Sequence, residues 1–164
     1  MQLTKEIDEL FADLDQLTTA HNPGLRAESG CGPVTAAILI GQTAGAERFP
    51  TDAHFARQAG TAPIPASSGN TNRYRLHRGG NRQLKKALHI IALTRVRIDP
   101  QTRAYIDRKR AEGKSMREAL RCLKRHLARR IWRLLFDTRS PTVLPISPAT
   151  TTAVGAPALM PCLG

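Results

Sequence analysis

Cysteine and aromatic residues are scarce in this sequence, and long apolar runs are missing. The three cysteines are far apart and odd in number, so their spacing predicts neither a zinc site nor a disulfide framework. Aromatic residues make up only 4% of the chain, which disfavours a membrane-surface helix because such helices anchor through aromatic side chains. No apolar run reaches the roughly 18 residues of a spanning helix, and the polar start Met1–Glu6 is no secretory signal. We therefore expect a cytoplasmic protein without a membrane partner.

Acidic residues are also scarce where basic residues are dense. The 164-residue chain has a net charge of +12. Residues 73–133 contain 20 Lys and Arg against four Asp and Glu, a local balance of +16. The rest of the chain has a balance of −4. A basic half beside a mildly acidic one indicates a polyanionic partner, most simply DNA or RNA.

Apolar residues recur at helical spacing along most of the chain, and no segment shows the convincing alternation of a strand. The first helical segment is residues 3–18, which is amphipathic and too short to be stable alone in water. It must pack on the domain or on a partner helix. Further helices are predicted at about residues 51–58, 82–97, 100–112 and 116–136, and each follows a capping residue, namely Thr51, Asn81, Asp99 and Ser115.

These segments predict an all-α fold, a small bundle of about five or six helices with a helix-hairpin-helix-like corner. We expect an amphipathic helix over residues 1–22, one domain over residues 23–138, and a disordered tail over residues 139–164. The tail is predicted because residues 140–164 contain five prolines and no charged side chain. The expected core consists of Ile38, Leu39, Phe55, Leu84, Leu88, Ile91, Leu120, Leu123, Leu127 and Ile131.

The predicted corner lies at Gly30-Cys31-Gly32. A Gly-x-Gly pair can belong to a dinucleotide site, but no strand precedes this one and no third glycine follows at the required place. We instead expect a short helix that ends near Ser29, a hairpin, and a new helix that begins at Pro33. Such a hairpin can offer the backbone N–H groups of Gly30 and Gly32 to a DNA phosphate. It can equally be a simple helix corner.

The segment over residues 63–88 combines features that suit chemistry on a phosphate. It begins with Pro63-Ile64-Pro65 and continues with two serines and a glycine, Ser67-Ser68-Gly69. Three arginines follow, Arg73, Arg75 and Arg78, whose guanidinium groups fit phosphate oxygens two at a time. A Gly-Gly break then leads into a helix whose first turns are basic, which favours an anion at its N-terminus. The same residues also fit an ordinary loop beside a solvated basic face.

Several blocks of this sequence, in this order, resemble one transposase family. The blocks are the glycine hairpin at residues 30–32, Gly60 with Pro63, Ser68-Gly69, the run from Arg78 to Leu88, and Gly113-Lys114-Ser115 with Glu118-Ala119-Leu120. They resemble the C-terminal domain of the DEDD-type insertion-sequence transposases, family one-ten with its relatives one-sixteen and nine-oh-two. The resemblance extends from about Leu25 to about Leu135.

The resemblance implies a role and a set of site residues. In that family, a serine before the glycine of this loop is the nucleophile that cleaves a DNA strand. By position it would be Ser68, with Ser67 as the alternative. The residues expected to contact DNA are Gly30, Gly32, Arg73, Arg75, Arg78, Asn81, Arg82, Lys85 and Lys86. The predicted function is therefore DNA binding with strand cleavage and rejoining, as in DNA transposition and recombination.

The resemblance also implies partners that this sequence does not supply. The family carries an N-terminal RuvC-like domain with four acidic residues, and a structured guide RNA selects its DNA. The acidic residues before residue 25 belong to the predicted amphipathic helix and not to such a domain, so a divalent metal would belong to that domain and this chain is expected to hold no cofactor. The N-terminal helix resembles the end of the family's coiled coil, which predicts a homo-oligomer or pairing with a RuvC-like domain. An N-terminally truncated, inactive remnant and a non-catalytic nucleic-acid-binding module are the alternatives.

Overall fold

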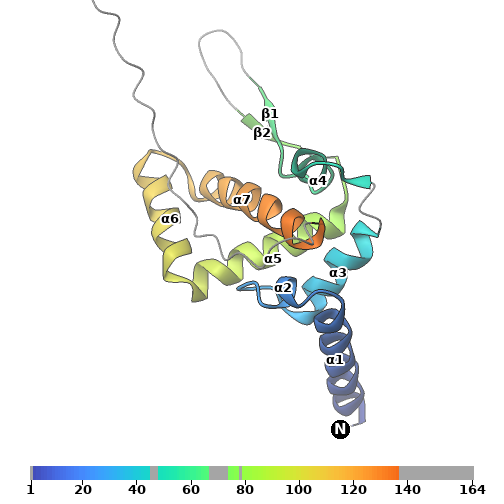
Figure 1. The fold of residues 1–164 in the computed structure, drawn as a ribbon. Coiled ribbons are helices and arrows are strands. Elements are labelled where there is room, and N and C mark those ends of the chain that lie inside the picture. Colours follow the sequence, from blue (N-terminus) through green and yellow to red (C-terminus); the bar gives the residue numbers. More distant parts are fainter. Residues whose placement is uncertain (1, 45–47, 67–73, 78, 137–164) are drawn as a thin grey trace, which may run out of the picture.

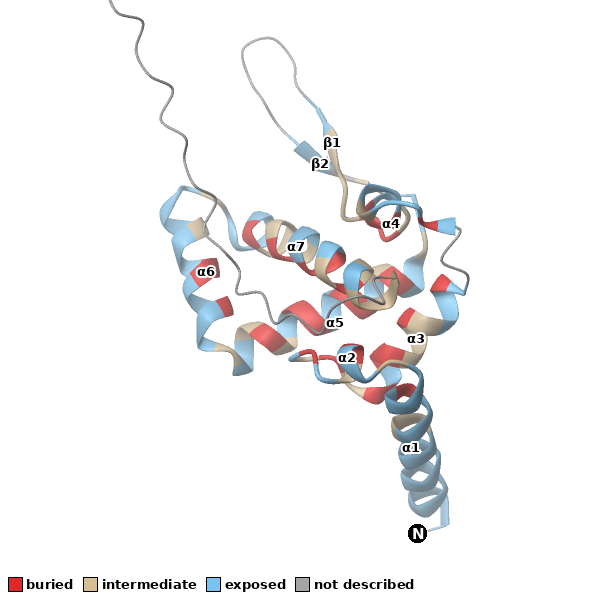
Figure 2. Ribbon diagram, in the orientation of Figure 1, coloured by how far each residue is buried: buried red, intermediate tan, exposed pale blue. Residues whose placement is uncertain are grey.

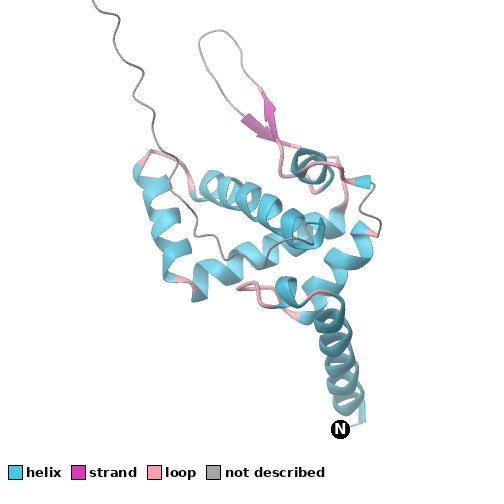
Figure 3. Ribbon diagram, viewed as in Figure 1, coloured by secondary structure: helices cyan, strands magenta, loops and turns pink. Residues whose placement is uncertain are grey.

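The fold is mainly helical, as expected (Figure 1, Figure 3). The computed structural model describes residues 2–44, 48–66, 74–77 and 79–136. Within these residues the elements are α1 Gln2–His21, α2 Pro23–Arg26, α3 Pro33–Thr43, α4 Asp52–Gln58, β1 Pro63–Pro65, β2 Tyr74–Leu76, α5 Arg82–Ile98, α6 Pro100–Ala111 and α7 Met116–Phe136. The predicted all-α class is confirmed. The predicted tail 139–164 lies outside the described residues.

Local capping signals place most helix starts correctly. The Asn81 side chain accepts hydrogen bonds from the backbone N–H groups of Gln83 and Leu84, at 2.8 and 3.2 Å. The Asp99 carboxylate accepts one from Gln101 N–H at 3.0 Å. The Ser115 backbone N–H donates to Glu118 Oε2 at 2.9 Å. Free N–H groups in the first turn need such partners, so these residues determine where the helices begin.

The core forms where α5 packs against α3, α6 and α7 (Figure 2). Eight of the ten predicted core residues are fully buried, whereas Ile38 and Leu120 are only partly buried and pack against the core from its edge. Further buried residues come from α2, α4 and α6 and from the turn before α4, and they include Leu25, Phe49, Ala56 and Ile106. The core therefore includes residues outside the helix faces that the apolar periodicity of the sequence predicts.

Helix α1 projects away from this core (Figure 1, Figure 2). It runs from Gln2 to His21, which is longer than the predicted residues 3–18. Its C-terminal part packs beside α2 and α3. Its apolar side chains remain largely exposed, with Leu3 at 73%, Leu10 at 64% and Leu17 at 68%. The domain does not cover the apolar face that the sequence pattern predicts.

Two short strands correct the expectation that the chain has none. β1 and β2 pair antiparallel, with Pro63 opposite Leu76, Ile64 opposite Arg75, and Pro65 opposite Tyr74. The strands project past α4, away from the helical body (Figure 1). Three residues are too few to show alternation, and prolines are depleted in strands. Pairing across the hairpin, rather than local propensity, therefore makes these strands.

Candidate nucleic-acid interface

The serine loop is carried by the β1–β2 hairpin. Residues 66–73 connect the two strands. Ser67, Ser68, Arg73 and Arg78 lie outside the described residues, so the structure does not place these predicted site residues. The strands on either side are placed, and Arg75 on β2 is exposed. The hairpin thus determines where the loop begins and ends.

The Gly-Gly break is packed against α4. Gly80 has φ +92°, and a Cβ atom there would lie 2.4 Å from the carbonyl oxygen of Gln58. The next residue, Asn81, donates its backbone N–H to that same oxygen at 2.7 Å. A side chain at position 80 would break this contact and strain the backbone. The break therefore fixes the start of α5 beside the end of α4.

The predicted basic residues of α5 occupy different environments. Lys85 is partly buried, and its Nζ donates to the backbone oxygens of His77 and Gly79, each at 3.3 Å. Arg82 and Lys86 are exposed on the first turns of α5. The Nδ2 of Asn81 donates to Gln42 Oε1 at 2.6 Å. Lys85 and Asn81 thus fix the segment that leads into α5 through hydrogen bonds, whereas the charges of Arg82 and Lys86 are exposed to solvent.

A cationic groove lies at the base of the hairpin. Its volume is about 890 Å³. One side is formed by β1, β2 and the turn before them, and the other by α7 and the α6–α7 turn (Figure 1). We call this the hairpin groove, and it is lined by Gly60, Thr61, Ala62, Pro63, Tyr74, Arg75, Lys114, Glu118, Arg121, Cys122, Lys124 and Arg125. Five of these residues are cations and one is an anion.

The cations of α7 and the α6–α7 turn were not among the predicted site residues. Arg121, Lys124 and Arg125 are spaced by three and four residues, so they share one side of the helix. That spacing is the signal that could have found them. Lys114 joins them from the turn, at the Gly113-Lys114-Ser115 block of the resemblance. Only the fold brings these residues and Arg75 to one groove.

The predicted corner between α2 and α3 is present, but its first helix is shorter than expected. α2 ends at Arg26 instead of near Ser29, and α3 begins at Pro33 as predicted. Gly30 has φ +83°, and a Cβ atom there would lie 3.0 Å from the carbonyl oxygen of Ile91. The Gly30 backbone therefore packs against α5, which favours the interpretation as a helix corner. Contact with a DNA phosphate at Gly30 and Gly32 stays a prediction.

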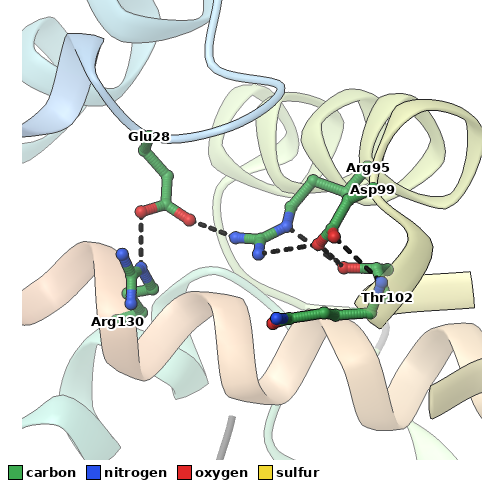
Figure 4. Close-up of polar contacts among 6 residues, drawn as sticks. Glu28, Arg95, Asp99, Thr102 and Arg130 are labelled. Atoms are coloured by element: carbon green, nitrogen blue, oxygen red, sulfur yellow. Dashed lines mark hydrogen bonds and ion pairs between the residues drawn. The ribbon is translucent and has the colours of Figure 1, made fainter. Parts of the chain in front are cut away.

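A buried ionic network lies just after the end of α2 (Figure 4). The Glu28 side chain is 2% exposed, and its two carboxylate oxygens accept hydrogen bonds from Arg95 of α5 and Arg130 of α7. Arg95 also contacts the Asp99 carboxylate at 3.2 Å, and Thr102 donates to that carboxylate. Glu28 follows the end of α2 by two residues and turns inward. The network joins the corner to three helices.

The Asp99 carboxylate titrates at unusually low pH because of this network. Burial raises the pKa of Asp99, but hydrogen bonds from Thr102, Arg95 and Gln101 outweigh burial, so the pKa lies below its usual value.

In the hairpin groove, burial and the nearby Arg121 and Lys85 lower the pKa of Lys124. The charged form of a lysine whose pKa is lowered in this way is stabilised when an anion binds beside it.

Neither a cluster of metal-ligand type nor a membrane-spanning helix is found in the part of the chain that the structure describes. No group of three His, Cys, Asp or Glu side chains there could hold a metal ion. In the same segments, no helix is both long and apolar enough to cross a bilayer.

The fold and the groove together define a small, basic, all-helical domain with a cationic groove beside a two-stranded hairpin. The chain belongs to the Transposase IS116/IS110/IS902 family, whose sequence model matches residues 24–107. This match confirms the resemblance to the C-terminal domain of insertion-sequence transposases. It includes the corner, the hairpin and all of α5.

Three curated proteins of insertion elements are similar to this chain. The IS110 43.6 kDa protein of Streptomyces coelicolor is 41% identical over 132 residues, which cover 78% of this chain and 32% of that protein. The IS900 42 kDa protein of Mycobacterium paratuberculosis is 32% identical over 93% of this chain and 38% of its own length. The IS116 44.8 kDa protein of Streptomyces clavuligerus is 30% identical over 91% and 36%. The chain thus spans about a third of the relatives that it matches.

Proposed function

We propose that this chain is the DNA-processing domain of an insertion-sequence transposase, which binds DNA and takes part in strand cleavage and rejoining. Family membership supports DNA as the substrate. The observation that carries the proposal is the position of the hairpin groove, because its cations line the base of the hairpin whose connection contains Ser67 and Ser68. Clustered Lys and Arg side chains bind backbone phosphates without reading sequence.

The proposed reaction is a transesterification at a DNA phosphate. Ser68 Oγ, or Ser67 Oγ as the alternative, forms a bond to phosphorus, and one deoxyribose P–O bond breaks. A general base takes the serine proton, and the leaving oxygen takes up a proton to become a free 3′- or 5′-hydroxyl. Arg73, Arg75 and Arg78 would stabilise the charge that develops on the phosphate oxygens. The phosphoserine link conserves the bond energy, so the reverse attack rejoins the strands.

The proposed partners follow from the same family. A RuvC-like domain would complete the active site, a structured guide RNA would select the DNA, and α1 would assemble copies of the chain. The exposed apolar face of α1 supports assembly, since Leu3, Ile7 and Leu10 are each more than half exposed. The reaction would take place in the cytoplasm, together with its DNA substrate.

A covalent-adduct assay tests the proposed nucleophile. The chain is complemented with a RuvC-like domain and guide RNA and is incubated with labelled suicide DNA, which traps the phosphoserine link. A denaturing gel shows the adduct as a shifted band. We expect Ser68→Ala to abolish the band and to leave DNA binding nearly intact. The matched control Ser67→Ala should retain it.

The outcomes separate the proposal from its alternatives. A band that survives Ser68→Ala and vanishes with Ser67→Ala moves the nucleophile by one residue. A band that survives both changes ends the serine mechanism. Normal DNA binding without any band in the complemented assay would identify a non-catalytic binding module instead.

A further inference from the structure

The hairpin groove is charged mainly along one wall. Arg121, Lys124 and Arg125 come from α7, and Lys114 comes from the turn between α6 and α7. Arg75 lies on β2, where successive side chains point to opposite faces, so its guanidinium group and the Tyr74 ring are on opposite sides of the hairpin. A row of cations along one wall can contact the phosphates of a single strand.

Most of these cations have no acidic partner in the structure. Within the described segments, no carboxylate lies within 4.0 Å of the charged groups of Arg75, Lys124 or Arg125. Glu118, the one acid of the groove, accepts hydrogen bonds from Ser115 and is 3.6 Å from Arg121. Burial and neighbouring cations also lower the pKa of Lys124. The groove therefore carries a surplus of positive charge that an anion would neutralise.

An exposed aromatic ring completes the groove. Tyr74 lies on β2 opposite Pro65, and 65% of it is exposed. The described residues give its ring no aromatic or cationic partner, in contrast to Phe49, Phe55 and Tyr105, whose rings pack against other groups. An exposed aromatic face beside a basic groove is what an unpaired base stacks on. The bases of a duplex are already stacked on one another and cannot use it.

We propose that the hairpin groove binds a single-stranded DNA segment, with its phosphates on Lys124 and Arg125 and one unpaired base stacked on Tyr74. The inference rests on the proposed function for its choice of DNA, because cutting a strand creates an end that can leave the duplex. The groove lies at the base of the hairpin that carries the serine loop, so it would hold a strand that enters or leaves that loop. Stacking on Tyr74 would give the groove a specificity for unpaired DNA that charge alone does not provide.

Fluorescence anisotropy with the intact chain tests the inference. The probes are a labelled 12-residue oligo(dT), a 12-base-pair DNA duplex and a 12-residue oligo(rU). We expect Tyr74→Leu, which removes the ring, to weaken oligo(dT) binding about tenfold and duplex binding by less than about twofold, since one stack is lost. Tyr74→Phe keeps the ring and should stay within about twofold of the parent chain. Because residue 74 is exposed, a thermal melt should show the same fold for all three proteins.

Charge variants test the walls of the groove. Arg125→Gln should weaken oligo(dT) binding several-fold more than Arg97→Gln, an equal change of charge at an exposed residue of α5 that does not line the groove. Equal effects of these two changes would overturn the assignment of the groove. So would a Tyr74→Leu protein that binds oligo(dT) as the parent chain does.

The duplex and the RNA separate the other outcomes. If the parent chain binds neither oligo(dT) nor duplex, DNA binding itself fails and the proposed function fails with it. If the chain binds duplex normally and Tyr74→Leu weakens nothing, only the groove assignment fails. The parent chain could instead bind oligo(rU) more tightly than oligo(dT), with Tyr74→Leu weakening the binding of both. That result would assign the groove to RNA and overturn the DNA occupant.

Discussion

The carboxylate of Glu28 shows how much one side chain can depend on distant residues. It lies between the guanidinium groups of Arg95 and Arg130, and only 2% of it is exposed. In the sequence it is one acid in a loop. In the fold it neutralises Arg95, whose side chain is 11% exposed. A buried guanidinium without a counter-ion is costly, so these two residues depend on each other.

We predict that Glu28→Ala lowers the free energy of unfolding by about 1.5–3 kcal/mol, because it removes the charged hydrogen bonds to Arg95 and Arg130 while Asp99 still faces Arg95. Urea unfolding followed by circular dichroism measures the change. Glu112→Ala is the matched control, since that carboxylate pairs with Lys109 and Lys114 at the surface and should matter little. Equal losses in the two variants would contradict a special role for the buried network.

Asp99 predicts a dependence of stability on pH. Its pKa is below the usual value, since hydrogen bonds from Thr102, Arg95 and Gln101 outweigh burial. Its ionised form therefore stabilises the fold above the unfolded-state pKa of about 3.9, and this contribution is lost as the pH falls through the lower folded-state pKa. Asp99→Asn should lower the free energy of unfolding by about 1 kcal/mol at pH 7. The difference in stability between the variant and the parent chain should narrow below about pH 4. Urea midpoints at pH 7, 5 and 3 test this, and a constant difference would refute it.

At the scale of elements, α1 is the helix whose apolar face has no cover within the chain. Its leucines and Ile7 lie along one side, and the exposed fractions exceed 60% for Leu3, Ile7, Leu10 and Leu17. A helix of this kind is stable when its face is buried against a partner. The remaining helices bury their apolar faces against α5 or α7.

We predict that α1 self-associates and that Leu10→Glu weakens the association constant at least tenfold. Burial of one leucine contributes about 1.5–3 kcal/mol, and a charge in its place would oppose contact. Sedimentation equilibrium over a range of concentrations measures the effect. Gln16→Glu adds the same charge at an exposed position on the opposite side of α1 and should change nothing. A parent chain that stays monomeric throughout would disprove the pairing.

At the scale of the whole molecule, charge separates the chain into two parts. Residues 73–133 have a balance of +16, and the rest has −4. We predict that binding to duplex DNA is strong at low salt and weakens steeply as salt rises, by about 0.9 in log–log slope for each phosphate contact. Lys86→Ala should lower the slope by about 1, while Lys5→Ala on α1 should not. A slope near zero would remove the polyanion interpretation altogether.

Helix positions were largely predictable because their signals act within one turn. Asn81, Asp99 and Ser115 mark helix starts with side chains that reach N–H groups two or three residues on. The predicted ranges 82–97 and 116–136 differ from α5 and α7 by at most one residue. The β1–β2 pair was missed because each strand has only three residues and gains its stability from the other.

The sequence by itself determined the family, the charge of the basic half and the start of nearly every helix, since these depend on composition and on neighbours along the chain. Tertiary structure alone decided the buried network and the hairpin groove. Glu28 meets Arg95 across 67 residues and Arg130 across 102, and Tyr74 and the cations of α7 line one groove only in the folded chain. Burial strengthens the contacts of the ionic network by removing water, and burial is a property of the packed fold, not of any one segment.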